Sequence, residues 1–188
     1  MLYYHDPQNA KSYAAMCEGY DASAQLEILS KVLPREATVL ELGSGPGNDL
    51  KLLAARYEVT GSDYSPAFVH MLKARFPNQT ILKLNAISIA TDGLFDGIYS
   101  NKILQHLNDD ELADSFRRQA QLLNQGGIVF HLIWRHIESP GGDNDLLFKP
   151  RSLSQMTAAM GNDFELLEAL DFGEFEDEDS LAILARKK

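Results

Sequence analysis

The stretch that most constrains the fold is VLELGSGPGN, Val39 to Asn48, in which aliphatic residues lead into three glycines. The aliphatic residues predict a buried strand, and the pattern after the glycines predicts a helix over residues 48–56. Glycine at Gly43 and Gly45 allows positive φ and lets a ligand come close to the backbone. The helix would direct its unpaired N–H groups at the same ligand. The stretch therefore predicts a strand, a glycine bend and a helix N-terminus that form a nucleotide-type site.

Two acidic residues narrow the kind of ligand. The glycine spacing is G-x-G-x-G, and Asn48 stands where a dinucleotide-binding fingerprint has its last glycine. Glu41 precedes the bend, which favours a ligand with a cationic end and disfavours a pyrophosphate. Asp63 ends the next expected strand, where a carboxylate accepts hydrogen bonds from both hydroxyls of a ribose. Together the two acids predict a nucleoside whose other end is cationic.

At the level of whole motifs, the chain resembles the class I S-adenosylmethionine-dependent methyltransferases of the small-molecule type. The resemblance implies an α/β fold: a Rossmann-like, doubly wound, mostly parallel seven-stranded sheet with helices on both faces and the last strand antiparallel. It also implies methyl transfer from S-adenosylmethionine to an unidentified small molecule by in-line displacement, with S-adenosylhomocysteine as product. The motifs, in family order, are ELGSGPG, Asp63, LNA at residues 84–86, FDGIYSNKILQHL at 95–107 and LLNQGGIVF at 122–130.

The resemblance assigns one group of residues to the methionine end of the cofactor. Gly43 and Gly45 would lie against the methionine part, and Glu41 would order the loop or meet the amino group through water. Tyr20 and Asn101 are further candidates for cofactor contact, from the N-terminal segment and from the end of the fourth expected strand. The alternative for Glu41 is a buried acid that pairs within the scaffold.

A second group is assigned to the nucleoside end. Asp63 would hold the ribose, Tyr64 would cover one face of the adenine, and Asn85 with the backbone of Ala86 would bind the adenine edge. Asn85 departs from the aspartate that is more usual in the family, although an amide still accepts from an amino group and donates to a ring nitrogen. For Tyr64 the alternative is an ordinary surface residue.

Catalysis by methyl transfer needs alignment and exclusion of water, and a base only where the acceptor loses a proton. His106, after the fourth expected strand, is the candidate base, with a structural histidine as the alternative. Tyr13, Tyr20 and His136 are further candidates, and Lys102 is a candidate for contact with the cofactor carboxylate. No metal is expected, because the five histidines show no ligand spacing and Cys17 is the only cysteine.

Charge and composition limit the partners. The net charge of −10 opposes binding to nucleic acid or to an anionic membrane surface. The sequence has neither the apolar core of a signal peptide nor an apolar run of about 20 residues, the length that spans a bilayer. We therefore expect a cytoplasmic enzyme with a small-molecule partner, no nucleic acid and no membrane, while its oligomeric state stays open.

Residues 1–188 are expected to form one methyltransferase domain, with residues 1–20 as an N-terminal flap and 135–149 as a substrate-side loop. The alternative for the tyrosines of residues 1–20 is that they pack on the edge of the sheet. The acidic stretch at 163–179 favours a solvated turn over a docking surface, and His131 is expected in the core. Expected strands cover 39–42, 57–62, 80–84, 95–100, 128–134, 164–172 and 181–185; expected helices cover 12–18, 21–33, 48–56, 66–76, 108–123 and 151–160.

Two other functions fit parts of the pattern. The first is an NAD(P)-dependent oxidoreductase, which would want glycine at Asn48 and no carboxylate at Glu41. The second is a non-catalytic S-adenosylmethionine-binding module that acts through a partner protein.

Overall fold

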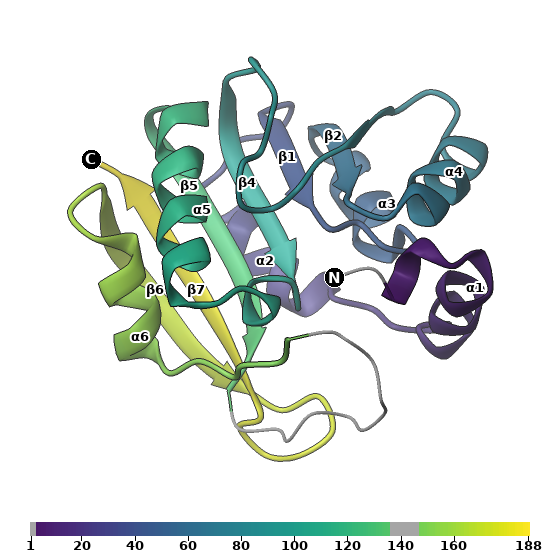
Figure 1. Cartoon of the computed structure of the whole chain (residues 1–188). Coiled ribbons are helices and arrows are strands. Elements are labelled where there is room, and N and C mark those ends of the chain that lie inside the picture. Colours follow the sequence, from purple (N-terminus) through teal and green to yellow (C-terminus); the bar gives the residue numbers. More distant parts are fainter. Residues whose placement is uncertain (1–2, 136–146) are drawn as a thin grey trace.

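The computed structural model describes residues 3–135 and 147–188, which form one twisted seven-stranded sheet in the order β3-β2-β1-β4-β5-β7-β6 (Figure 1). Parallel pairing joins β3, β2, β1, β4 and β5, whereas β7 runs antiparallel to both β5 and β6. The doubly wound sheet with its last strand antiparallel is therefore confirmed. The strands are β1 Thr38–Leu42, β2 Glu58–Asp63, β3 Thr80–Lys83, β4 Phe95–Asn101, β5 Leu123–Trp134, β6 Phe164–Phe172 and β7 Ser180–Lys187.

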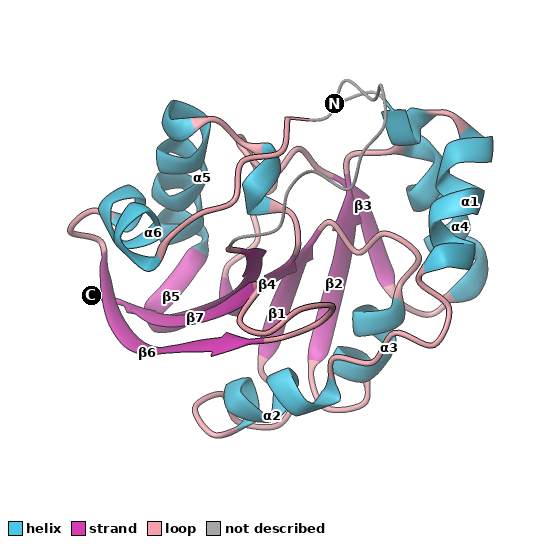
Figure 2. Ribbon diagram, turned by 90° about the horizontal axis from the view of Figure 1, so that it is seen from below, coloured by secondary structure: helices cyan, strands magenta, loops and turns pink. Residues whose placement is uncertain are grey.

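Helices cover both faces of the sheet, as Figure 2 shows. On one face lie α2 (Ser23–Ser30) and α3 (Asn48–Ala54), and on the other lie α5 (Asp109–Leu122) and α6 (Leu153–Met160). Near the β3 edge, α4 (Pro66–Arg75) contacts β2 and β3, and α1 (Pro7–Met16) contacts α4.

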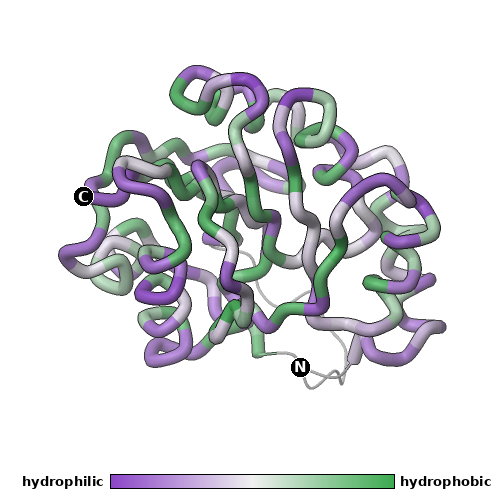
Figure 3. Tube along the Cα trace, turned by 90° about the horizontal axis from the view of Figure 1, so that it is seen from above, coloured by the Kyte–Doolittle hydropathy of each residue, from purple (hydrophilic) through white to green (hydrophobic). Residues whose placement is uncertain are grey.

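Successive residues of the central strands serve opposite faces of the sheet. Val39 joins the cluster under α2 and α3, while the next residue, Leu40, joins the cluster under α5 and α6. This alternation follows from the two-residue period of a strand. The apolar segments accordingly run through the middle of the molecule, with hydrophilic segments at its periphery (Figure 3).

Several element boundaries differ from the sequence-based expectation, for local reasons. Helix α1 begins at Pro7, earlier than expected, because the Asp6 side chain caps it by accepting from the backbone N–H of Gln8 at 2.7 Å. A helix was expected over 21–33, but α2 starts only at Ser23, and the Asp21 carboxylate accepts from the N–H of that residue at 2.8 Å.

The largest difference concerns β5. This strand was expected to begin at Ile128, but it already begins at Leu123 and contains the glycines at 126 and 127. Gly126 has a φ of 73°, and the pairing register with β4 shifts between Phe95 and Gly97. The glycines therefore form an irregularity inside a longer strand.

No helix in the described parts of the chain is both long enough and apolar enough to span a membrane. Most of the expected substrate-side loop, including His136, lies outside the described residues.

Candidate functional site

The glycine bend joins the end of β1 to the start of α3. Gly43, Gly45 and Gly47 all have positive φ, at 72°, 48° and 86°. A Cβ on Gly43 would lie 2.1 Å from Cδ1 of Ile103, so that side chain sits directly against the bend. The bend also contacts β2, because the N–H of Ser44 donates to the carbonyl of Ser62 at 2.7 Å. Glycine is thus favoured here by backbone conformation, and the side chain of Ile103 fills the space beside Gly43.

Asp63, at the end of β2, reaches across to this bend. Its Oδ2 accepts from the N–H of Gly45 at 2.9 Å, and its Oδ1 accepts from the N–H of Ser65 at 2.8 Å. Burial raises the pKa of Asp63 to about 6, although these backbone hydrogen bonds favour the charged form. The two residues expected to bind opposite parts of one nucleoside are therefore adjacent.

Glu41 is buried beneath the same bend and orders it. Its Oε2 accepts from the hydroxyl of Ser44 at 2.6 Å, and its carbonyl accepts from the hydroxyl of Ser62 at 2.7 Å. Burial, together with the nearby charge of Asp49, raises the pKa of Glu41 to about 8. Of the two roles expected for Glu41, this geometry fits the ordering of the loop.

A polar network beside the bend contains Asp49, which the sequence analysis did not single out. Oδ2 of Asp49 accepts from the hydroxyl of Tyr99 at 2.8 Å and from Nδ2 of Asn101 at 2.9 Å. Oδ1 of Asp49 and Oδ1 of Asn101 are buried without a hydrogen-bond partner among the described residues. An acid in the first turn of a helix is common, so only the fold shows that this one is 7% exposed.

The N-terminal segment covers the glycine bend from outside, as the purple elements beside the carboxyl ends of the strands show in Figure 1. Nδ2 of Asn48 donates to the carbonyl of Cys17 at 2.8 Å. The ring of Tyr13 would lie 3.9 Å from a Cβ on Gly45. Tyr20 accepts from Nδ2 of Asn101 at 2.9 Å. The N-terminal segment therefore packs against the bend, and the side chain of Asn48 holds it there.

At the expected nucleoside end, the loop after β3 forms a turn of its own. Oδ1 of Asn85 accepts from the N–H of Ile87 at 2.7 Å, so the amide oxygen expected to meet an adenine amino group is already engaged within the loop. The ring of Tyr64 lies 5.1 Å from that of His5 and is half-buried. The carbonyl of Ala86 accepts from the hydroxyl of Ser115 at 2.7 Å.

That contact with Ala86 ends a chain of hydrogen bonds through the core. Gln119 donates from Nε2 to Ser115 at 3.1 Å, so its Oε1 faces His131 Nε2 at 2.9 Å as an acceptor. His131 Nδ1 then accepts from Ser100 at 2.8 Å. Burial lowers the pKa of His131 to about 3, which keeps the ring neutral. The expected core position of His131 is confirmed.

His106 and Lys102 follow β4 on the other side of the bend. His106 Nδ1 lies 2.7 Å from the carbonyl of Leu147, so Nδ1 carries the proton and Nε2 is left as an acceptor. Burial lowers the pKa of His106. Lys102 Nζ contacts Ser180 at 2.7 Å and Glu174 at 3.2 Å, and thus faces the β6–β7 loop and not the cofactor position suggested by the sequence.

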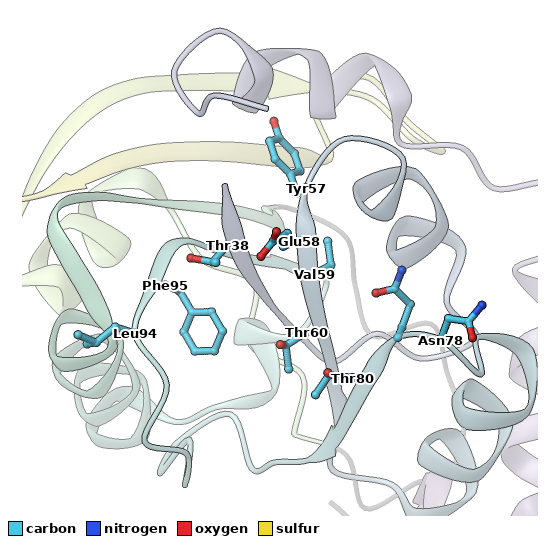
Figure 4. A pocket seen from close by; sticks show the side chains of 10 residues that line it. Thr38, Tyr57, Glu58, Val59, Thr60, Asn78, Thr80, Leu94 and Phe95 are labelled. Atoms are coloured by element: carbon cyan, nitrogen blue, oxygen red, sulfur yellow. The ribbon is translucent and has the colours of Figure 1, made fainter. Parts of the chain in front are cut away.

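A hollow of about 420 Å³ lies at the opposite end of the sheet (Figure 4). Its walls come from the first residues of four neighbouring strands, among them Thr38, Glu58, Thr80 and Phe95. It is therefore separate from the glycine bend, which follows the carboxyl ends of the strands, where ligands bind in this class of sheet.

Comparison with known proteins agrees with this arrangement. The sequence model of a family described as a methyltransferase domain matches residues 39–127. A trans-aconitate 2-methyltransferase from Methylobacterium radiotolerans is 38% identical over 108 residues, which cover 55% of this chain and 40% of that relative. The match thus spans less than half the length of the curated relative.

Two solved structures share the fold across nearly the whole chain. A S-adenosylmethionine-dependent methyltransferase from Clostridium acetobutylicum has a TM-score of 0.78 at 11% identity, covering 94% of this chain and 98% of that one. The N-methyltransferase NodS from Bradyrhizobium japonicum, in complex with S-adenosylhomocysteine, has a TM-score of 0.75 at 16% identity and covers 98% of both chains. The chain thus has the fold of these methyltransferases, and its residues 39–127 match the methyltransferase-domain family.

Proposed function

We propose that this chain transfers the methyl group of S-adenosylmethionine to a small-molecule acceptor. The observation that carries the proposal is the contact between Asp63 and Gly45, since it joins a ribose-type acid to the glycine bend at the reversal of strand order between β1 and β4.

The buried groups around the bend fit both ends of this cofactor. A ribose hydroxyl would replace the Gly45 N–H as a donor to Asp63. The unpartnered oxygens of Asp49 and Asn101 offer acceptors to an α-ammonium group. Buried acceptors without donors are costly, so a cationic ligand end relieves a cost present in the free protein. The side chain of Ile103 must move aside, because it occupies the space over Gly43.

The cofactor supplies a methyl group already activated by its positive sulfonium. The chain's contribution is alignment and exclusion of water, which supply roughly 7 kcal/mol or more of a barrier in well-oriented systems. The flap that contacts the bend through Asn48 and Tyr13 provides the cover.

His106 is the proposed base for an acceptor that loses a proton. Its Nδ1 proton is held by the carbonyl of Leu147, which leaves the Nε2 lone pair to receive a proton from an acceptor O–H or N–H. The lowered pKa of His106 keeps the ring unprotonated at neutral pH, in the form that a base requires.

The test is calorimetric titration with S-adenosylhomocysteine and, separately, with NAD. Binding of S-adenosylhomocysteine and not of NAD supports the proposal, whereas binding of NAD alone refutes it. Transfer of labelled methyl to an acceptor panel then separates an enzyme from a non-catalytic binding module. His106→Gln should reduce kcat and abolish its dependence on a group titrating below pH 7, while affinity for S-adenosylhomocysteine stays unchanged.

A further inference from the structure

We infer that the proposed cofactor site binds the purine base through its ring nitrogens and makes no use of the 6-amino group of adenine. The inference rests on the proposed function and deepens it, because it concerns which base the site selects. It is carried by the loop after β3, residues 84–89, in which every oxygen of Asn85 and Ala86 already accepts a hydrogen bond within the protein.

This loop begins beside the acid that would hold the ribose. Lys83, the last residue of β3, pairs in register with Asp63 at the end of β2. The N–H of Leu84 then donates to the carbonyl of Asp63 at 3.1 Å. A base attached to a ribose at Asp63 would therefore meet the residues that follow Leu84, at the edge of the sheet where ligands bind.

The loop itself fixes the orientation of the Asn85 amide. Oδ1 of Asn85 accepts from the N–H of Ile87 at 2.7 Å, in a turn that asparagine and aspartate both form. A main-chain N–H only donates, so the side-chain atom that it meets is the oxygen and not the nitrogen. The acceptor of this half-buried side chain is thus directed into the loop, and Nδ2, with its two donors, lies on the other side of the amide.

The main-chain oxygens of the loop are engaged as well. The carbonyl of Asn85 accepts from the N–H of Ile89 at 2.9 Å. The carbonyl of Ala86 accepts from the hydroxyl of Ser115 at 2.7 Å. Ser115 is fully buried and accepts from Nε2 of Gln119, so its single proton is committed to Ala86.

These contacts leave donors and no unengaged acceptor on this part of the loop. The donors are Nδ2 of Asn85 and the N–H of Ala86, and neither bonds to any of the described residues. Adenine offers one donor, its 6-amino group, together with ring nitrogens that accept. The two donors of the loop match the ring nitrogens, whereas the amino group meets no acceptor. A purine without the amino group would therefore form the same hydrogen bonds.

The amide of Asn85 decides this polarity. An aspartate here would keep the turn, because one carboxylate oxygen would accept from the N–H of Ile87. Its second oxygen would stand where Nδ2 now stands and would accept from a 6-amino group. Asparagine thus replaces an acceptor by a donor at one position and leaves the loop unchanged.

The experiment compares S-adenosylhomocysteine with its purine analogue, in which a hydrogen replaces the 6-amino group. Both compounds keep the ring nitrogens, the ribose and the amino acid, so the ratio of their affinities in calorimetry reports on the amino group. We expect affinities within about twofold of each other, less than the roughly fivefold difference that one net hydrogen bond makes. Any larger preference for S-adenosylhomocysteine would mean that an acceptor meets the amino group, and it would overturn the inference.

A variant supplies the missing acceptor. Asn85→Asp should bind S-adenosylhomocysteine about tenfold or more better than the purine analogue, the range for a hydrogen bond to a charged group. Asn78→Asp is the matched control, since it makes the same chemical change before β3, at the other end of that strand, and should leave the two affinities alike. Thermal unfolding checks that both variants are folded. If Asn85→Asp shows no preference, or Asn78→Asp shows the same one, Asn85 does not meet the base and the inference is wrong.

Failure of the proposed function would give a different result. If neither compound binds the original protein, the chain does not hold this cofactor, and the inference falls with the proposed function. If the original protein binds both compounds but clearly prefers S-adenosylhomocysteine, cofactor binding stands and only the inference is lost.

Discussion

Asp63 and Gly45 are joined by a hydrogen bond of 2.9 Å, although 18 residues separate them in the sequence. The carboxylate thus holds the glycine bend in the free protein with the oxygen that a ribose would use. In the proposed complex a ribose hydroxyl would replace the Gly45 N–H as donor, so the Asp63 carboxylate is in place before the ligand arrives, whereas the side chain of Ile103 has to move.

Asp63→Asn should weaken S-adenosylhomocysteine binding by about tenfold to a hundredfold, the range for losing hydrogen bonds to a charged acceptor. Calorimetry measures the affinity. The melting temperature of the unliganded variant should change much less than the affinity. The substitution removes a hydrogen-bond acceptor, but it also removes a charge that is costly to bury. An affinity within twofold of that of the original protein would contradict the role of Asp63.

The affinity for S-adenosylhomocysteine should also depend on pH. With a pKa of about 6 in the free protein, Asp63 is ionised above that pH and protonated below it. A ribose is bound by the ionised form, so the affinity should fall as pH is lowered through 6. Titrations from pH 5 to 8 test this, and the Asp63→Asn variant should show no such fall. An identical pH dependence in both proteins would assign it to another group.

Gly43→Ala and Gly126→Ala form a matched pair. Both glycines have nearly the same positive φ, 72° and 73°, so alanine introduces similar backbone strain, roughly 1 kcal/mol, at either position. A Cβ on Gly126 meets nothing within 4 Å, whereas one on Gly43 lies 2.1 Å from Ile103. We expect Gly43→Ala to abolish S-adenosylhomocysteine binding and Gly126→Ala to leave it unchanged. Thermal unfolding of both variants checks that each is folded. Equal affinities would show that the bend tolerates a side chain.

The positions of site residues were predictable from the sequence where the local backbone demands one particular residue type. Positive φ at Gly43 and a carboxylate at the end of β2 follow directly from a glycine bend between strand and helix. The orientation of Lys102 was not predictable, because its partner Ser180 lies about 80 positions further along the chain. Asp49 was missed for a similar reason. Its partners lie on β4, and only the parallel pairing of β1 with β4 places them beside α3.

Boundaries were predicted least well where side chains compete for the same backbone groups. Asp6 and Asp21 both precede a helix, yet only Asp6 caps the helix that follows it directly. A strand was expected only from Ile128, whereas β5 runs through Gly126 and Gly127 and pairs with β4 on both sides of them, at Leu123 and again from Ile128. Long-range pairing decides such cases, and its partners cannot be identified from a local pattern.

Glu41 should make the protein less stable as pH rises from about 6.5 to 8. Its pKa is near 8 when folded and 4.5 as a free group, so in this range the folded state holds a proton that the unfolded chain has lost. The free energy of unfolding therefore falls with rising pH, by at most about 1.4 kcal/mol per pH unit. Urea unfolding at several pH values measures the slope. Glu41→Gln should flatten it, whereas Glu58→Gln, at the exposed start of β2, should not. An unchanged slope in Glu41→Gln would mean that Glu41 is ionised in the fold.

His131 has the opposite effect on stability, because it makes the protein less stable as pH falls. Its pKa is about 3 when folded and 6.5 as a free group, so the unfolded chain binds a proton between these values that the fold excludes. Stability contributed by the neutral ring is therefore present above pH 6.5 and is lost as pH falls toward 3. His131→Phe should remove this loss. It should also destabilise the protein at pH 7 by about 2 kcal/mol or more, because Ser100 and Gln119 lose their partner in the core.

Gln119→Leu breaks the same chain of hydrogen bonds nearer to Ala86, while the carbonyl of Ala86 keeps its bond from Ser115. If the chain of bonds positions the loop at Ala86, both variants should weaken S-adenosylhomocysteine binding in calorimetry. Unchanged affinity in folded protein would limit the role of the chain to stability.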